Sequence, residues 1–160
     1  LGAPVAAILG LALFLVWPPS PASSESELSQ AARYAVTTHH SQLPVDVSGG
    51  EEVVQRYLTA NVAFAATAPF VNRRDLRLLG ARLTHVDGQL AVVYQYQLGS
   101  RRISVLQTPR RQPAVRRNRV VKHMLGYGVV TFNDRGVTHA VVGALSDQDL
   151  MKLVPGQAHR

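Results

Sequence analysis

The chain begins with a long apolar stretch, Leu1–Trp17, that contains no charged side chain and shows no alternation of apolar and polar positions. A run of this length is typical of a helix that crosses a membrane, whereas a buried strand is shorter. Trp17 lies where an interfacial aromatic residue is expected, and three prolines within the next four residues then interrupt a helix. The pattern predicts a transmembrane helix over residues 1–17, truncated at its start, and a linker over residues 18–26.

The charges that flank this run indicate the side of the membrane on which the rest of the chain lies. Residues 18–32 include Glu25 and Glu27 but no lysine or arginine, which under the positive-inside rule favours a non-cytoplasmic location. A cleaved signal peptide is the alternative, because Pro21-Ala22-Ser23 resembles a cleavage site. Both interpretations place the remaining residues outside the cytoplasm.

Two stretches after the linker have the spacing of amphipathic helices. The first follows a capping-box pair, Ser24 and Glu27, and its apolar face would contain Leu28, Ala31, Ala32, Ala35 and Val36. The second follows the pair Ser48 and Glu51, and its apolar stripe would contain Val53, Val54, Tyr57, Leu58 and Val62. Residues 43–47 between them are predicted to be extended, because Pro44 disfavours helical geometry before it.

From Leu76 onwards the apolar period changes from helical to alternating. Gly80 stands at a change of phase and predicts a β-bulge, while Asp87-Gly88 and Gly99-Ser100 predict tight hairpin turns. Five strands are expected, starting at Leu76 and over residues 90–98, 103–105, 127–132 and 137–142. A short helix is expected from Ser146, with Asp149 at capping distance.

The predicted fold is therefore an α+β domain, with two N-terminal helices, a five-stranded antiparallel meander sheet and a short C-terminal helix, preceded by the transmembrane helix. Helices that are segregated from hairpin-linked strands are expected to pack on one face of the sheet. The domain would span residues 27–155, with 156–160 as a tail. About 120 to 130 residues remain after the apolar run, the size of one domain.

The net charge of +7 is concentrated in one proline-containing stretch after the third strand. Its basic residues are Arg110, Arg111, Arg116, Arg117, Arg119 and Lys122. Blocks of like charge are usually exposed loops, and this one is accompanied by few aromatic residues. If the loop binds a partner, anionic lipid headgroups or an acidic protein surface fit it better than nucleic acid.

Few residues suggest catalysis or metal binding. The chain contains no cysteine, which excludes disulfides, thiolate metal sites and cysteine nucleophiles. The carboxylates mostly stand at predicted caps and turns, and no hydrolase, nucleotide-binding or metalloprotease motif is present. Gly126-Tyr127-Gly128 lies in a strand pattern, so it predicts close backbone packing rather than dinucleotide binding. We expect no enzyme activity and no catalytic, cofactor-binding or metal-binding residues in this chain.

The histidines are the only other candidate metal ligands. His39 and His40 are adjacent and would point in different directions on a helix, while His85, His123 and His139 are far apart in the sequence. His139 alternates in phase with Val137 and Val141, which predicts an inward or half-buried side chain. Without a carboxylate or second histidine at ligand spacing, structural or surface roles are expected.

The order of several short segments resembles the exported part of bacterial transmembrane anti-sigma factors. The segments are Leu43-Pro44-Val45-Asp46-Val47, Glu52-Val53-Val54-Gln55-Arg56-Tyr57-Leu58, Leu79-Gly80-Ala81-Arg82-Leu83, Val92-Val93-Tyr94, and Gly136 to Leu153 with Val142-Gly143-Ala144-Leu145-Ser146-Asp147. The resemblance covers most of the chain after the apolar run. Its motifs are short and structural.

The resemblance implies a single-pass protein of the bacterial inner membrane with an extracytoplasmic sensory or regulatory domain. A cytoplasmic domain, often zinc-binding, would hold an extracytoplasmic-function sigma factor, but the present sequence contains neither that domain nor its zinc motif. The sigma factor, zinc and an envelope protein or protease are thus expected partners of the parent protein, and the family carries no catalytic residue onto this chain. The alternative is a secreted or membrane-anchored, non-catalytic binding protein of the cell envelope.

Overall fold

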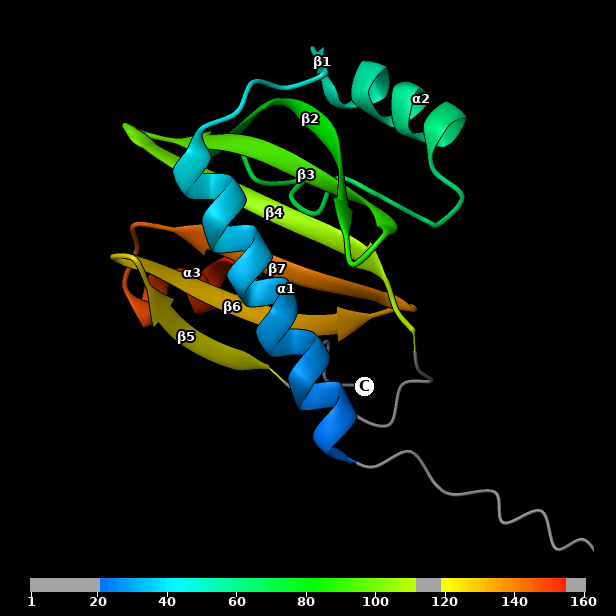
Figure 1. Ribbon diagram of the computed structural model, residues 1–160. Helices are drawn as coiled ribbons and strands as arrows, with labels where there is room; N and C mark the ends of the chain where they lie inside the picture. The colour runs from blue at the N-terminus through cyan, green and yellow to red at the C-terminus, as the bar shows by residue number, and fades with distance from the viewer. Residues whose placement is uncertain (1–20, 112–118, 155–160) are drawn as a thin grey trace, which may run out of the picture.

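The computed structural model of the protein describes residues 21–111 and 119–154 (Figure 1). Three helices and seven strands follow one another along these residues. The helices are α1 (Pro21–Ser41), α2 (Glu51–Asn61) and α3 (Asp147–Leu153). The strands are β1 (Val47–Ser48), β2 (Leu76–Val86), β3 (Gln89–Leu98), β4 (Arg101–Pro109), β5 (Val120–Met124), β6 (Tyr127–Asp134) and β7 (Val137–Gly143).

All seven strands form one antiparallel sheet with the order β1-β2-β3-β4-β7-β6-β5. The prediction of a five-stranded meander is therefore wrong in both number and connection. In a meander β4 would pair with the next strand along the chain, but it pairs with β7, from Ile103 opposite Gly143 to Pro109 opposite Val137. The β5–β6 hairpin lies beyond β7, so the chain crosses over after β4.

The two strands that the sequence did not predict have physical reasons for being missed. β1 is only two residues long, too short for an alternating pattern. β5 carries Lys122 and His123 at its centre, and these charges made it resemble part of the basic loop. Its turn to β6 is formed by Leu125 (φ 53°) and Gly126 (φ 81°), and leucine is an unusual residue at positive φ.

The helices cover both faces of the sheet, which corrects the prediction that they pack on one face. α1 lies across β4, β7, β6 and β5 (Figure 1), while α3 packs against β6 and β7 on the opposite face. The α1 side has its own core, built from small side chains that let the helix approach closely. Its buried residues include Ala31, Ala32, Ala35, Val36, Ala91, Val93, Leu106, Val129, Ala140 and Val142.

The opposite face carries the larger core. Its buried side chains include Val54 and Leu58 of α2, Tyr94 and Tyr96 of β3, and Leu150 of α3. The loop between α2 and β2 contributes to the same core through Phe70 and neighbouring alanines. One sheet thus joins two apolar layers, each closed by different segments of the chain.

Glycine positions explain two of the local features. The β-bulge predicted at Gly80 is confirmed by a shift of register between Leu78 and Gly80, where φ is +153°. A Cβ atom at Gly80 would collide with the carbonyl oxygen of Val47, so β1 can approach β2 only at this glycine. The close packing predicted at Gly128 is also confirmed, since a Cβ atom there would collide with Leu150 of α3.

The predicted N-cap residue is confirmed only for α3, where the Ser146 side chain accepts a hydrogen bond from the Asp149 amide. α2 is capped by Gly50 without a side-chain hydrogen bond, while Ser48 belongs to β1. α1 begins at Pro21, earlier than the expected Ser24 cap, so residues 21–26 of the predicted linker are helical.

The transmembrane helix predicted over residues 1–17 lies outside the described residues, as do the tail over 156–160 and most of the basic loop. Among residues 21–111 and 119–154, no helix is both long and apolar enough to span a membrane.

Candidate functional site

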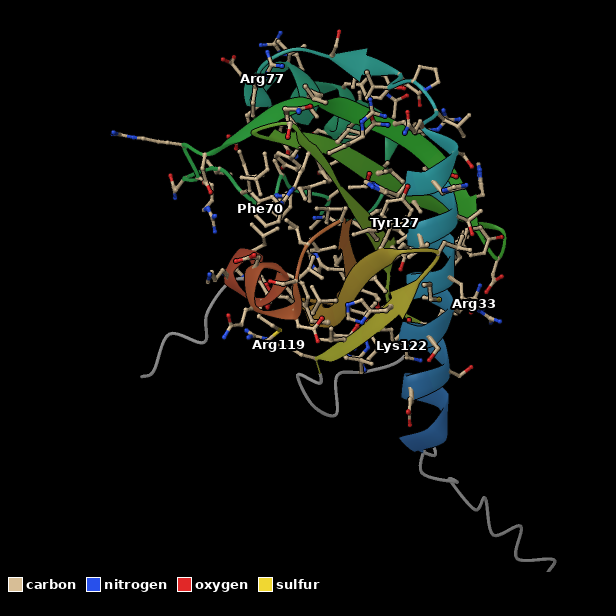
Figure 2. The ribbon with its side chains drawn as sticks, turned by 90° about the vertical axis from the view of Figure 1, so that its left-hand side faces the viewer. Arg33, Phe70, Arg77, Arg119, Lys122 and Tyr127 are labelled. Atoms are coloured by element: carbon tan, nitrogen blue, oxygen red, sulfur yellow. The ribbon has the colours of Figure 1, made fainter. Side chains whose placement is uncertain are left out.

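The two ends of the basic stretch each contact the N-terminal half of α1. Arg110 and Arg111 follow the end of β4. Arg119 directly precedes β5 and Lys122 lies at its centre (Figure 2). Arg116 and Arg117 lie outside the described residues. The prediction of a loop up to Lys122 is corrected here, because the strand begins at Val120.

Contacts to α1 hold both ends in place. The Arg111 amide donates to Oε1 of Glu27 at 3.3 Å, and its guanidinium donates to the carbonyl oxygen of Asp87 at 3.0 Å. On the other side of the stretch, Nζ of Lys122 donates to Oγ of Ser29 at 2.6 Å. Arg111 therefore has an anionic neighbour, whereas Lys122 donates to a neutral hydroxyl.

Arg110 is positioned differently from the other basic residues. Its amide donates to the carbonyl oxygen of Gly136 at 2.9 Å, which ties the end of β4 to the β6–β7 turn. The Nε and Nη1 atoms of its guanidinium are buried and have no hydrogen-bond partner within the described parts of the chain. A buried unpaired donor is costly, so among the described members of the predicted set Arg110 has the strongest need for an acceptor.

β5 forms one edge of the sheet and pairs with β6 from Val120 opposite Thr131 to Met124 opposite Tyr127. Its side chains alternate between the two layers. Lys122 lies on the α1 side, while His123 lies on the α3 side, where Nε2 is 3.0 Å from Oδ1 of Asp147. These contacts fix the edge strand to a helix on each face.

The hairpin geometry determines which main-chain groups of β5 face away from the sheet. In a two-residue hairpin the residues that flank the turn exchange both hydrogen bonds, and bonded pairs then alternate along the ladder. Met124, Lys122 and Val120 therefore bond to β6, and the N–H and C=O groups of Val121 and His123 point outward. Leu125, at the tip of the same hairpin, is 68% exposed.

The histidines have structural roles in the described residues. His39 is buried on α1, its Nδ1 lies 2.7 Å from Oγ of Ser104, and its ring packs edge-on against Tyr127. The predicted half-buried position of His139 is confirmed, and its ring stacks on Phe132 with ring centroids 4.8 Å apart. No group of three metal-ligating side chains is found in residues 21–111 and 119–154.

Burial changes the titration of both buried histidines. Burial, with smaller contributions from Arg102 and His40, lowers the pKa of His39. Burial lowers the pKa of His139 to about 4, against a smaller opposite effect of Asp134. Both rings are therefore neutral at pH 7 and serve as packing and hydrogen-bonding groups.

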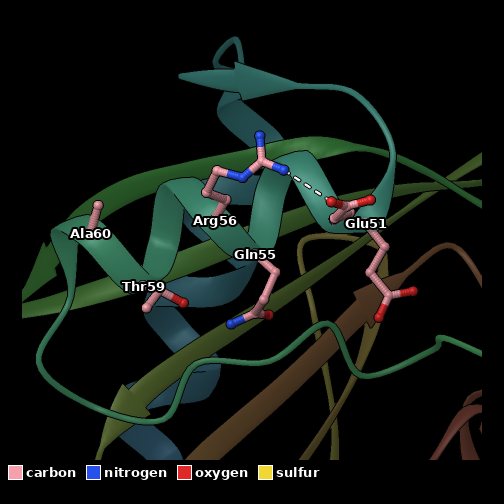
Figure 3. A pocket seen from close by; sticks show the side chains of 6 residues that line it. Glu51, Gln55, Arg56, Thr59 and Ala60 are labelled. Atoms are coloured by element: carbon pink, nitrogen blue, oxygen red, sulfur yellow. Dashed lines mark hydrogen bonds and ion pairs between the residues drawn. The ribbon is translucent and has the colours of Figure 1, made fainter.

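An open depression of about 710 Å³ lies along α2 (Figure 3). The described residues that line it all come from α2: Glu51, Glu52, Gln55, Arg56, Thr59 and Ala60. Arg56 is engaged in an exposed ion pair with Glu52 at 2.9 Å. Because the described lining contains no group from a second element, this surface lacks the convergence that a catalytic or cofactor site needs.

A smaller cavity of about 110 Å³ lies between α2, β3 and the loop before β2, where Glu51, Arg73 and Tyr96 contribute to its wall. Burial raises the pKa values of Tyr94 and Tyr96 far above the ordinary value for a phenol, so both remain protonated. The space corresponds to several water molecules, since one molecule needs about 10 to 15 Å³ of such volume. It is too small for an organic cofactor.

A comparison with protein-family models finds no match for this chain, and a comparison with curated protein sequences finds no similar protein. The site must therefore be interpreted from its own geometry. Among the described surfaces, the β5 edge with its cationic side chains has the clearest features of an interaction site. This edge could not be predicted from the sequence, because an edge is a property of strand order, which no local pattern encodes.

Proposed function

We propose that the protein is a non-catalytic, extracytoplasmic sensory or regulatory domain of an anti-sigma factor. The observation that carries the proposal is the position of α1. This helix begins four residues after Trp17 and, in the described residues, closes one of the two cores of the sheet. An event that loosens the sheet therefore changes the state of the helix next to the apolar run.

The packing of α1 explains why this coupling would be strong. Leu28, Ala31, Ala32, Ala35 and Val36 are each at most 4% exposed. The three alanines and Val36 contact a layer formed by strands that are far apart in the sequence, so α1 cannot leave without exposing the sheet. The domain and its N-terminal helix are expected to unfold together.

Release of the sigma factor would follow from this coupling by conformational change or by regulated proteolysis. A docked α1 presents helical backbone, which proteases cleave poorly because they bind extended chains. When the domain is bound or unfolded by a stimulus, residues next to the apolar run would become extended and accessible. Export of the domain is supported by the apolar run and by the absence of basic residues before Arg33.

The second candidate function is a secreted or membrane-anchored binding protein of the cell envelope with no role in transcription. The outward main-chain groups of β5 favour a binding role in either case. The two functions differ in their partners: only a regulator of transcription would co-purify with a sigma factor.

The test compares cleavage of the protein in two matched variants in its own cells. Val92→Asp places a charge in the core, where Val92 is 0% exposed, whereas Val53→Asp places the same charge on α2, where Val53 is 47% exposed. The proposal expects Val92→Asp to speed cleavage at the start of α1, within residues 21–26, and to activate the genes of the sigma factor, and Val53→Asp to do neither.

Equal cleavage in both variants would contradict the regulatory coupling. Recovery of the tagged protein with a sigma factor would support the anti-sigma function. Recovery without one, together with unchanged transcription, would favour the binding protein of the envelope.

A further inference from the structure

We propose that the β5 edge binds an extended, acidic segment of a partner protein by adding it to the sheet as an eighth strand. The inference rests on the proposed function, because it names the surface and the chemical class of the partner through which a regulatory domain would act. It is carried by the strand order, by the charge of Lys122 and by the register of β5.

The edge has main-chain groups available for a new strand. The N–H and C=O groups of Val121 and His123 point away from β6, and among the described residues β5 pairs with β6 alone. β-strand addition derives its affinity from such main-chain hydrogen bonds and its specificity from alternate side chains. The contacts of Lys122 with Ser29 and of His123 with Asp147 hold β5 in position from both faces of the sheet.

A second copy of the same chain fits this edge poorly. The antiparallel register that pairs all five residues of β5 with themselves places Lys122 opposite Lys122. Position 122 is a non-hydrogen-bonded position on the outer side, where facing side chains come closest. Like charges directly opposite each other are destabilising, so the sequence disfavours pairing between copies.

The same geometry favours a carboxylate opposite Lys122. Its ammonium donates to the neutral Ser29 hydroxyl, so an acidic side chain on an added strand would add an opposite charge beside α1. Val120 and Met124 lie on the same face, two positions away on either side. The preferred segment therefore has Asp or Glu at its centre and apolar residues two positions before and after it.

The probe for this proposal is a fluorescein-labelled, end-capped peptide with the core Val-Thr-Glu-Thr-Val. Binding to the full 160-residue chain, kept in solution with a mild detergent, is followed by fluorescence anisotropy. A control peptide has Lys in place of the central Glu. We expect the Glu peptide to bind at least about fivefold more tightly, since opposing an unlike rather than a like charge changes a cross-strand pair by about 1 kcal/mol.

Two variants test the geometry and the charge separately. Val121→Pro removes one outward N–H without removing a bond to β6, so the pairing of β5 with β6 is kept while binding of either peptide is lost. Lys122→Glu should reverse the preference and make the Lys peptide the tighter ligand. Thermal unfolding of each variant confirms that the domain remains folded.

Several results would overturn the proposal. The first is that neither peptide binds at millimolar concentration. The second is that both peptides bind with equal affinity, and the third is that Val121→Pro leaves the affinity unchanged. A dimer of the unmodified chain that dissociates on Val121→Pro would also overturn it, because the edge would then belong to a second copy. None of these results bears on cleavage next to α1, so failure of this inference is distinguishable from failure of the proposed function.

Discussion

The imidazole Nδ1 of His39 lies 2.7 Å from the hydroxyl oxygen of Ser104, and this buried hydrogen bond joins α1 to the middle of the sheet. The two residues are 65 positions apart in the sequence. The edge-on contact between His39 and Tyr127 lies beside this bond, with ring centroids 4.7 Å apart. The C-terminal half of α1 is thus fixed by a polar contact as well as by its alanines.

Ser104→Ala is expected to weaken the docking of α1. The substitution leaves a buried imidazole nitrogen without its partner, at a cost of about 1 to 3 kcal/mol in the free energy of unfolding. Chemical denaturation followed by circular dichroism measures this change. Ser100→Ala, in the exposed turn between β3 and β4, is the control and should change the stability very little; equal losses would show that the bond contributes nothing specific.

The domain should lose stability as the solution is made acidic. The pKa of His139 is about 4 in the folded protein and 6.5 when unfolded, so below pH 6.5 the unfolded state binds more protons. This contribution is intact above pH 6.5 and is lost as the pH falls towards 4. Between pH 7 and pH 5 the loss from this residue is about 2 kcal/mol.

His139→Gln provides the control, because glutamine keeps a polar side chain but does not titrate. Urea unfolding at pH 7 and pH 5 should show a smaller acid effect in this variant. The lowered pKa of His39 acts in the same direction, so part of the effect should remain. An unchanged pH dependence in His139→Gln would show that His139 is already protonated or exposed in the folded protein.

Gln107 is expected to stabilise the loop between α2 and β2. Its amide nitrogen donates to the carbonyl oxygen of Thr67 at 2.8 Å, and its oxygen accepts from the Thr67 amide at 3.2 Å. Gln107→Leu leaves both groups of Thr67 unpaired and should cost about 2 kcal/mol or more, with faster hydrogen exchange in residues 62–75. Gln97→Leu, which removes an exposed bond to Gly99, should leave that exchange unchanged.

Gly128→Ala should destabilise the contact between β6 and α3. The added methyl group would overlap Leu150, which is 0% exposed, and overpacking of this kind costs about 1 to 3 kcal/mol. Leu150→Ala alone creates a cavity, but the double variant should lose less stability than the sum of the two single losses. Additive losses would show that the two side chains do not compete for the same space.

Local patterns in the sequence were sufficient for the features that depend on neighbours in the chain. The Gly80 bulge, the Asp87-Gly88 and Gly99-Ser100 turns and the Ser146 cap were predicted because each needs a residue type with a particular backbone preference or side-chain acceptor. The apolar stripe of α1 was likewise visible, because a period of 3.6 residues does not depend on what the helix packs against.

Only the tertiary structure decided the strand order, the placement of helices on both faces and which strands form the edges of the sheet. β7 lies between β4 and β6 because its residues are apolar on both faces and are buried best at the centre of the sheet, whereas β5 with Lys122 and His123 is stable at an edge. Burial on both faces is a sum over distant segments, so it selects the order of strands without leaving a local signal. The sequence by itself determined the three helices and five of the seven strands through local patterns; the competition for burial among all these segments determined where each one lies in the sheet.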